Sequence, residues 1–205
     1  MPLIKAVSVS RPVLDLLAGP LRSGSGLGSG YLDFEGYVVA LTRPGRPRLP
    51  NGVECELQVE AGQRAWIGEG RLEAGGTVVL PGPAWEPVPE PRFRPETDRP
   101  YRPDPLRLAG RGGGLTPAGD DLLAGYAAGL FLFWGRAREA GEIAEAAAPR
   151  TTSLSATLLR HAARGELPEP AHALLEQGDP GPLQRFGHSS GRALLVGLAL
   201  ASARS

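Results

Sequence analysis

Residues 110–121, GRGGGLTPAGDD, directly precede the most apolar run of the chain, LLAGYAAGLFLFW at 122–134. A Thr-Pro step suits a helix start, because the threonine hydroxyl can accept a hydrogen bond from the N3 amide and proline fits position N1. We therefore predict a helix over residues 117–134 with Thr116 as its N-cap. Asp120 and Asp121 then lie in the first turns, where carboxylates oppose the positive end of the helix dipole.

Downstream of this helix the sequence keeps a helical pattern. Apolar residues recur with helical spacing at 137–148, 153–164, 170–177 and 190–203. These segments predict an all-helical bundle of about five helices over residues 105–205. No internal repeat is recognised along the chain.

Upstream, the pattern is that of strands. Short β-rich runs, such as YLDFEGYVVALT at 31–42 and RLEAGGTVVLPG at 71–82, are broken by glycines, which is typical of hairpins in a small barrel or sandwich. One short helix is expected at 12–19. The predicted fold class is α+β, with a β-rich lobe over residues 1–85, a proline-rich, extended and semi-rigid connector over 86–104, and the helical lobe after it.

Composition excludes several classes of protein. Twenty-two basic residues balance twenty-two acidic ones, so no net field recruits nucleic acid or an anionic membrane. The single cysteine, Cys55, excludes an intrachain disulfide and a multi-cysteine metal cluster, and its alternating surroundings predict a buried thiol. The start lacks a signal-peptide core and no apolar run is long enough to span a membrane, so we expect a cytoplasmic protein.

Helix capping does not explain the glycines of the 110–121 segment. Three consecutive glycines, Gly112–Gly114, precede the cap, and Gly119 falls at N3, where glycine is costly in a helix. Such glycines allow a nest of amides that binds phosphate or carboxylate at a helix N-terminus. Arg111 is the only cation nearby, and the lysine of a Walker loop is absent. A capping role, an anion site and a Mg²⁺ site on the two aspartates with substrate oxygens all stay open.

The last predicted helix repeats this kind of start. The sequence FGHSSG at 186–191 offers Ser189 or Ser190 as N-cap, with His188 beside them as the most plausible general acid or base of the helical lobe. Small residues recur every fourth position in both helices, in one below Asp121 at Gly125 and Gly129, and in the other at Ala193, Gly197 and Ala201. If the helices pack in parallel along these stripes, their N-termini meet and form a polar pocket for a small anion.

Three stretches together resemble a known family. GGGLTPAGDDLLAG, TTSLSATLLRHAARGELPE and FGHSSGRALLVGL occur in that order above a β-rich lobe. This is similar to a bacterial family, catalogued as a domain of unknown function, that includes a subunit associated with oxamate carbamoyltransferase in allantoin degradation. Arg192 departs from the polar residue expected in the family. The resemblance implies other carbamoyltransferase subunits as partners and a small anionic substrate: carbamoyl phosphate, oxamate or oxalurate.

Residue by residue, the prediction places catalysis on three side chains and substrate binding on eight others. The catalytic candidates are Asp120, Asp121 and His188, and the two aspartates are also the candidate Mg²⁺ ligands. The substrate-binding candidates are Arg111, Gly112, Gly113, Gly114, Thr116, Gly119, Ser189 and Ser190. Two other functions remain as alternatives: a non-catalytic structural or regulatory subunit with an anion site, and a stand-alone Mg²⁺-dependent phosphate-processing enzyme.

Overall fold

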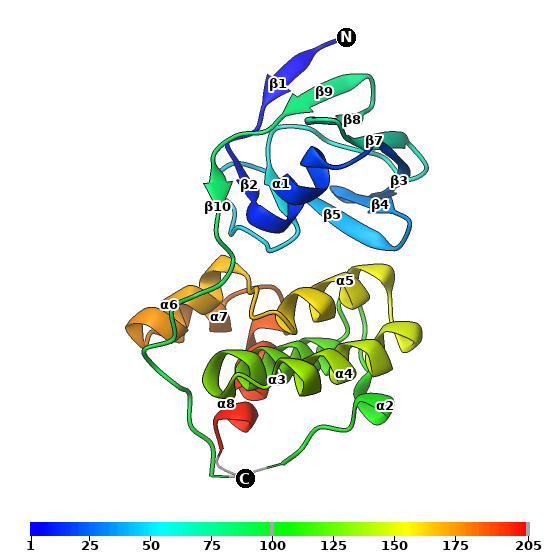
Figure 1. Cartoon of the computed structure of the whole chain (residues 1–205). Coiled ribbons are helices and arrows are strands. Elements are labelled where there is room, and N and C mark those ends of the chain that lie inside the picture. The colour runs from blue at the N-terminus through cyan, green and yellow to red at the C-terminus, as the bar shows by residue number, and fades with distance from the viewer. Residues whose placement is uncertain (99–100, 204–205) are drawn as a thin grey trace. The chain divides into compact units, whose positions relative to one another are not determined.

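The computed structural model describes residues 1–98 and 101–203 and divides into two compact units, Met1–Pro87 and Val88–Ser205. The first unit holds the strands and the second holds most of the helices (Figure 1). The predicted mixed fold, β-rich first and helical second, is therefore confirmed. The two units are described separately below.

Ten short strands and one helix make up the β-rich unit. The strands are β1 (Leu3–Lys5), β2 (Ser8–Ser10), β3 (Arg22–Gly28), β4 (Tyr31–Phe34), β5 (Tyr37–Thr42), β6 (Gly52–Glu54), β7 (Arg64–Gly68), β8 (Arg71–Ala74), β9 (Thr77–Leu80) and β10 (Ala84–Trp85). The helix α1 (Arg11–Ala18) agrees with the short helix predicted there.

All ten strands belong to one curled sheet, in the order β1-β9-β8-β7-β3-β4-β5-β6-β2-β10. At one end β1 runs parallel to β9, and at the other β2 runs parallel to β10. Because β1 leads into β2 and β9 leads into β10, the same two chain segments form both ends of the sheet. A single curled sheet agrees with the predicted barrel better than with two packed sheets. Cys55 is buried in its core, as predicted, and burial raises the pKa of its thiol.

The helical unit contains the five predicted helices and three short ones that the sequence pattern did not reveal. The predicted ones are α3 (Ala118–Trp134), α4 (Ala137–Ala147), α5 (Ser153–Ala162), α6 (Glu169–Gln177) and α8 (Ser190–Ser202). The others are α2 (Pro105–Leu108), η1 (Ala148–Arg150) and α7 (Gly181–Gln184), all too short to show a periodic pattern. No helix in residues 1–98 and 101–203 is long and apolar enough to cross a membrane.

The segment after Pro87 is irregular but attached to the helices. The amides of Arg92 and Phe93 donate hydrogen bonds to the carbonyl of Leu175 in α6. The guanidinium carbon of Arg94 lies 5.2 Å from the ring centre of Phe133 and 4.9 Å from that of Trp134. This part of the expected connector is therefore held by specific contacts rather than only by its prolines. The predicted boundaries at residues 85 and 104 stay a prediction.

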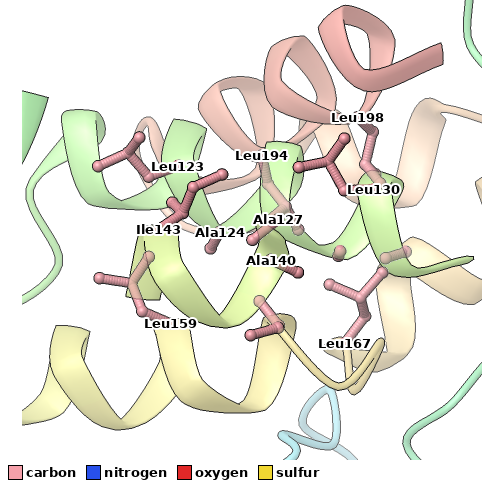
Figure 2. Close-up of a cluster of buried hydrophobic side chains, with 14 of the residues drawn as sticks. Leu123, Ala124, Ala127, Leu130, Ala140, Ile143, Leu159, Leu167, Leu194 and Leu198 are labelled. Carbon is pink, nitrogen blue, oxygen red and sulfur yellow. The ribbon is translucent and has the colours of Figure 1, made fainter. Parts of the chain in front are cut away.

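Helices α3 and α8 lie parallel and unusually close to each other. A Cβ on Gly125 would lie 2.1 Å from the carbonyl oxygen of Leu194, and one on Gly197 would lie 2.1 Å from that of Leu122. One turn further on, a Cβ on Gly129 would meet Ala201 at 2.4 Å. The predicted stripes of small residues thus form this contact, and Figure 2 shows the buried leucines of both helices beside it.

Substituting these glycines tests the close approach. Alanine in place of glycine normally stabilises a helix interior by up to about 1 kcal/mol. We expect Gly125→Ala and Gly197→Ala instead to destabilise the protein by roughly 1–3 kcal/mol, the usual cost of overpacking. Gly141→Ala in α4 is the control, because nothing lies within 4 Å of its Cβ position, and it should stabilise. Denaturant melts of the three variants measure this, and equal effects at all three positions would contradict the close contact.

A second prediction concerns the helical unit by itself. Its buried cluster, from Leu123 to Leu198, draws only on residues after position 107. A core within one segment is the property of a domain that can fold alone. We expect a fragment of residues 88–205 to show helical circular dichroism and a cooperative thermal transition, whereas a fragment from residue 105, which lacks the Arg94 contacts, should melt at a lower temperature.

Candidate functional site

The three stretches that carry the family resemblance meet at the start of three helices. The hydroxyl oxygens of Thr116 and Ser190 lie 3.0 Å apart and share a hydrogen bond. The hydroxyl of Thr152 donates to the carbonyl of Leu115 at 2.8 Å. Residues 110–121, 150–155 and 187–192, which we call the three-helix cluster, thus bring together the N-termini of α3, α5 and α8. The predicted meeting of α3 and α8 is confirmed, and α5 is an addition that the sequence did not indicate.

Capping in the three-helix cluster differs from the prediction at α3. The N-cap is Pro117, with no side-chain capping bond, so Thr116 does not cap the helix and Gly119 lies at N2 rather than N3. The reason is tertiary, because the Thr116 hydroxyl is bonded to Ser190 of another helix. At α8 the N-cap is Ser189, again without a side-chain capping bond. At α5 the N-cap is Thr152, and its hydroxyl accepts a hydrogen bond from the Ser155 amide at 3.0 Å.

Asp120 fastens the parts of the three-helix cluster to each other. Its side chain is almost fully buried, with 2% exposed. Oδ1 accepts a hydrogen bond from the Gly110 amide at 2.8 Å, and Oδ2 accepts one from the Thr151 hydroxyl. One carboxylate therefore ties the glycine loop to the start of α5, with one hydrogen bond to each of its oxygens.

Asp121 lies in the interface of α3 and α8, where the small-residue stripe predicted it. The pKa of its carboxyl is raised from 3.8 to about 6, mainly by burial; the hydroxyls of Ser190 and Thr116 lower it in part, and the negative charge of Asp120 adds to the rise. Its Oδ2 atom is buried and has no hydrogen-bond partner within the described residues. Asp121 is thus the carboxyl of the pair with unused hydrogen-bonding capacity.

Glycine is needed in the three-helix cluster for different reasons at different positions. Gly112 and Gly114 have φ angles of 123° and 92°, which other residues rarely adopt. Gly119 is required by packing, because a Cβ there would lie 2.1 Å from the Leu108 carbonyl oxygen. Gly113 has neither a positive φ nor any atom within 4 Å of its Cβ position, and it is exposed. The loop over Gly112–Gly114 is therefore open to an approaching ligand.

Three arginines belong to the segments of the three-helix cluster. Arg111, Arg150 and Arg192 are exposed, and in the described part of the chain none of them forms an ion pair. The expectation that Arg111 is the only nearby cation is therefore wrong, since the chain fold adds two more. His188 is exposed, and no hydrogen bond joins it to either aspartate among the described residues.

The arrangement of side chains gives only partial support to the predicted Mg²⁺ site. Within residues 1–98 and 101–203, no group of three or more His, Cys, Asp or Glu side chains is placed to hold one. Each oxygen of Asp120 already accepts one hydrogen bond, and Mg²⁺ on Asp120 and Asp121 would need ligand oxygens as well. The Mg²⁺ site stays a prediction.

His161 is fully buried in the last turn of α5. The ring has no exposure, its Nδ1 contacts the Glu166 carboxylate, and Arg164 contacts the same carboxylate at 2.9 Å. Burial lowers the pKa of His161; burial also raises that of Glu166, but the bonds from His161 and Arg164 outweigh it and lower that pKa overall. The spacing in RHAARGE is the signal that would have predicted this group. It closes the end of α5 rather than joining the three-helix cluster.

The β-rich unit has a shallow hollow of its own. It is lined by Ser8, Ser10, Thr42, Arg48, Leu49, Gly52, Glu54 and Trp85. The Ser10 hydroxyl is buried there without a hydrogen-bond partner in the described structure, while Glu54 accepts from the Ser8 hydroxyl and the Gly45 amide. No residue was predicted to act here, and the hollow is too small to make it the leading candidate.

Comparison with known families agrees with the three motifs. Residues 108–202 match the family model described as oxamate carbamoyltransferase subunit AllH, which confirms the predicted resemblance. The matched residues lie within the helical unit and include the three-helix cluster from Arg111 to Arg192. No curated protein and no solved structure gives a significant match to the chain.

Neutralising the two aspartates should change the free energy of unfolding in opposite directions. The pKa of folded Asp121, about 6, exceeds its ordinary 3.8, so the native state binds more protons than the unfolded state between these values. Its contribution to stability is therefore full below about pH 4 and is lost as pH rises through about 6. We expect Asp121→Asn to raise the free energy of unfolding at pH 7 and to flatten its dependence between pH 4 and 6.

Asp120→Asn is the matched comparison. The new amide nitrogen can face the Thr151 hydroxyl, which can accept from it, but both charge-assisted hydrogen bonds of the buried carboxylate are replaced by weaker neutral ones, so we expect a loss of about 1–3 kcal/mol. Denaturant melts between pH 4 and 8 measure both variants. A stability loss at pH 7 in Asp121→Asn equal to that in Asp120→Asn would show that both carboxylates only oppose the helix dipoles.

Proposed function

Because residues 108–202 match the family model described as oxamate carbamoyltransferase subunit AllH, we propose that this chain is a subunit of an oxamate carbamoyltransferase-like enzyme and binds a small anionic ligand at the three-helix cluster. The observation that carries the proposal is the convergence of three helix N-termini beneath an open glycine loop and three arginines without ion pairs among the described residues. A family described as a subunit implies further subunits as partners.

Electrostatics supports an anion at this place. Each helix N-terminus carries roughly half a positive charge on its unpaired amides, and here three of them meet. The only carboxylates in the three-helix cluster are Asp120, which is enclosed, and Asp121, which lies between α3 and α8. Phosphate and carboxylate groups match amides and arginines, so carbamoyl phosphate, oxamate and oxalurate all have suitable chemistry.

A division of roles follows for carbamoyl transfer. The amide nitrogen of oxamate attacks the carbonyl carbon of carbamoyl phosphate, a C–N bond forms, the C–O bond to phosphate breaks, and the nitrogen loses a proton. We assign the departing phosphate to the Gly112–Gly114 amides and Arg111, which stabilise its charge. The proton goes to Asp121, whose pKa is raised to about 6, or to the imidazole of His188. Asp120 holds the loop in position.

A non-catalytic subunit with the same anion site is the second candidate. It is favoured by the exposure of His188 and its lack of a bond to either aspartate among the described residues, since a general base is usually oriented by a second group. A stand-alone Mg²⁺-dependent phosphate-processing enzyme has less support, because no group of three or more His, Cys, Asp or Glu side chains in residues 1–98 and 101–203 is placed to hold a metal ion. Activity of the purified chain toward carbamoyl phosphate plus oxamate, alone and with the neighbouring subunits, distinguishes these candidates.

Ligand binding is tested by calorimetry with phosphate and with oxamate. We expect Arg111→Ala to weaken binding about 10-fold, as for loss of one charge-assisted hydrogen bond of about 1.5 kcal/mol. Gly113→Val should abolish it without unfolding the protein, because its Cβ position is open and its φ is not positive. The control is Arg138→Ala, which removes an exposed arginine of α4 that pairs with Glu142. Unchanged affinity in both loop variants would place the anion elsewhere.

A further inference from the structure

We infer that the β-rich unit contains two copies of one three-stranded unit, related by an approximate two-fold axis. The first copy is β3, β4 and β5, and the second copy is β7, β8 and β9. In sequence, residues 28–39 read GSGYLDFEGYVV and residues 68–79 read GEGRLEAGGTVV. At a constant offset of 40 they share three glycines, a leucine and two valines. The expectation of no internal repeat is therefore wrong, and the shared positions are those that backbone geometry and the core constrain most.

Backbone conformation repeats at the same positions. Gly28, Ser29 and Gly30 have φ angles of 84°, 53° and 83°, and Gly68, Glu69 and Gly70 have 130°, 50° and 81°. The next turn repeats as well, with Glu35 at 56° beside Gly36 at 87°, and Gly75 at 57° beside Gly76 at 71°. In the described part of the chain, every non-glycine residue with positive φ lies in these turns. Such residues are uncommon, so their coincidence supports two copies.

Burial and pairing follow the repeat. Strands β4 and β8 show the same alternation of half-buried and buried residues, with Leu32 and Leu72 both in the core. Gly28 pairs with Tyr31 across the first turn, and Gly68 pairs with Arg71 across the second. The first copy carries one extra residue, Leu27, in a bulge that the second copy lacks. Upstream of the bulge, equivalent residues are therefore 41 apart.

Sheet order shows how the copies meet. Strands β3 and β7 pair in antiparallel register, Ser23 with Trp66, Gly24 with Ala65 and Ser25 with Arg64. Gly24 and Ala65 are equivalent residues 41 apart, so this junction pairs a position with its own counterpart, as a two-fold axis requires. Outward from it the order is β4-β5-β6 on one side and β8-β9 on the other. The parallel partner of β5 is β6, and the parallel partner of β9 is β1.

The segments that lead into β3 and β7 exchange places in the same manner. Helix α1 precedes β3, yet its end is bonded to the turn of the second copy, where the Glu69 and Gly70 amides donate to the carbonyls of Gly19 and Leu17. The loop before β7 is bonded to the first copy, with the Gly62 amide donating to the Gly26 carbonyl. The segment that leads into each copy is thus hydrogen-bonded to the other copy. Within the chain, β3 of the first copy pairs with β7 of the second.

A segment transplant in the full chain tests the duplication. Residues 68–79 are replaced by the first copy's sequence with Ala kept at position 74, GSGYLDAEGYVV, to avoid a new phenylalanine in the core. The control carries the same residues one position later, LGSGYLDAEGYV, which turns every side chain to the wrong face. We expect the transplant to keep a cooperative thermal transition of the β-rich unit and the control to lose it. Equal loss, or equal retention, in both would overturn the duplication.

Single substitutions provide a second test that does not require the transplant to pack well. Because Ser29 and Glu69 have the same positive φ, Ser29→Gly and Glu69→Gly should shift the melting temperature upward by similar amounts. Glu73→Gly, within β8, should shift it downward, since glycine weakens a strand. Shifts of opposite sign at positions 29 and 69 would contradict the equivalence of the two turns.

Discussion

The helical unit depends on the direct backbone contact of α3 with α8. With Gly125 facing Leu194 and Gly197 facing Leu122, no side chain separates the two helices at these points. The contact also fixes their direction, because Gly129 meets Ala201 further along and the Trp134 indole nitrogen donates to the Ala201 carbonyl. Parallel packing over this length places Thr116 beside Ser190, so the polar cluster at the helix starts is a consequence of small residues two or more turns away.

Parallel helices carry an electrostatic cost that the same segment offsets. Like ends of helix dipoles repel, and the start of α5 adds a third positive end. Asp120 and Asp121 supply the opposing charge, but by different means. Asp120 accepts a hydrogen bond on each oxygen and links two of the segments, whereas Asp121 is held between helices at the expense of desolvation, which raises its pKa. A bound anion would also oppose the positive ends of the helix dipoles. The glycine loop and the two aspartates therefore belong to one electrostatic arrangement.

Local and periodic features were predictable from the sequence, and long-range contacts were not. The helix spans followed from apolar spacing, and the stripe of Asp121, Gly125 and Gly129 gave the correct interface. The Thr116 cap was wrong because a hydroxyl from another helix competes for the same side chain, which local capping rules cannot include. The role of Thr151 on Asp120 was missed for a similar reason. The duplication was not predicted, because α1 leads into β3 whereas an irregular loop leads into β7. The two copies therefore resemble each other in sequence only within the two hairpins.

Glycine is used in two physical ways in this chain, and the difference bears on function. At some positions of both units it permits positive φ, as at Gly30 and Gly112, and at others it permits close approach, as at Gly26 and Gly125. Gly113 fits neither use, because its φ is not positive and its Cβ position is empty. Among the loop glycines it is the one whose identity the fold leaves unaccounted for. Access of a ligand to the backbone amides is a reason for glycine that does not depend on the fold.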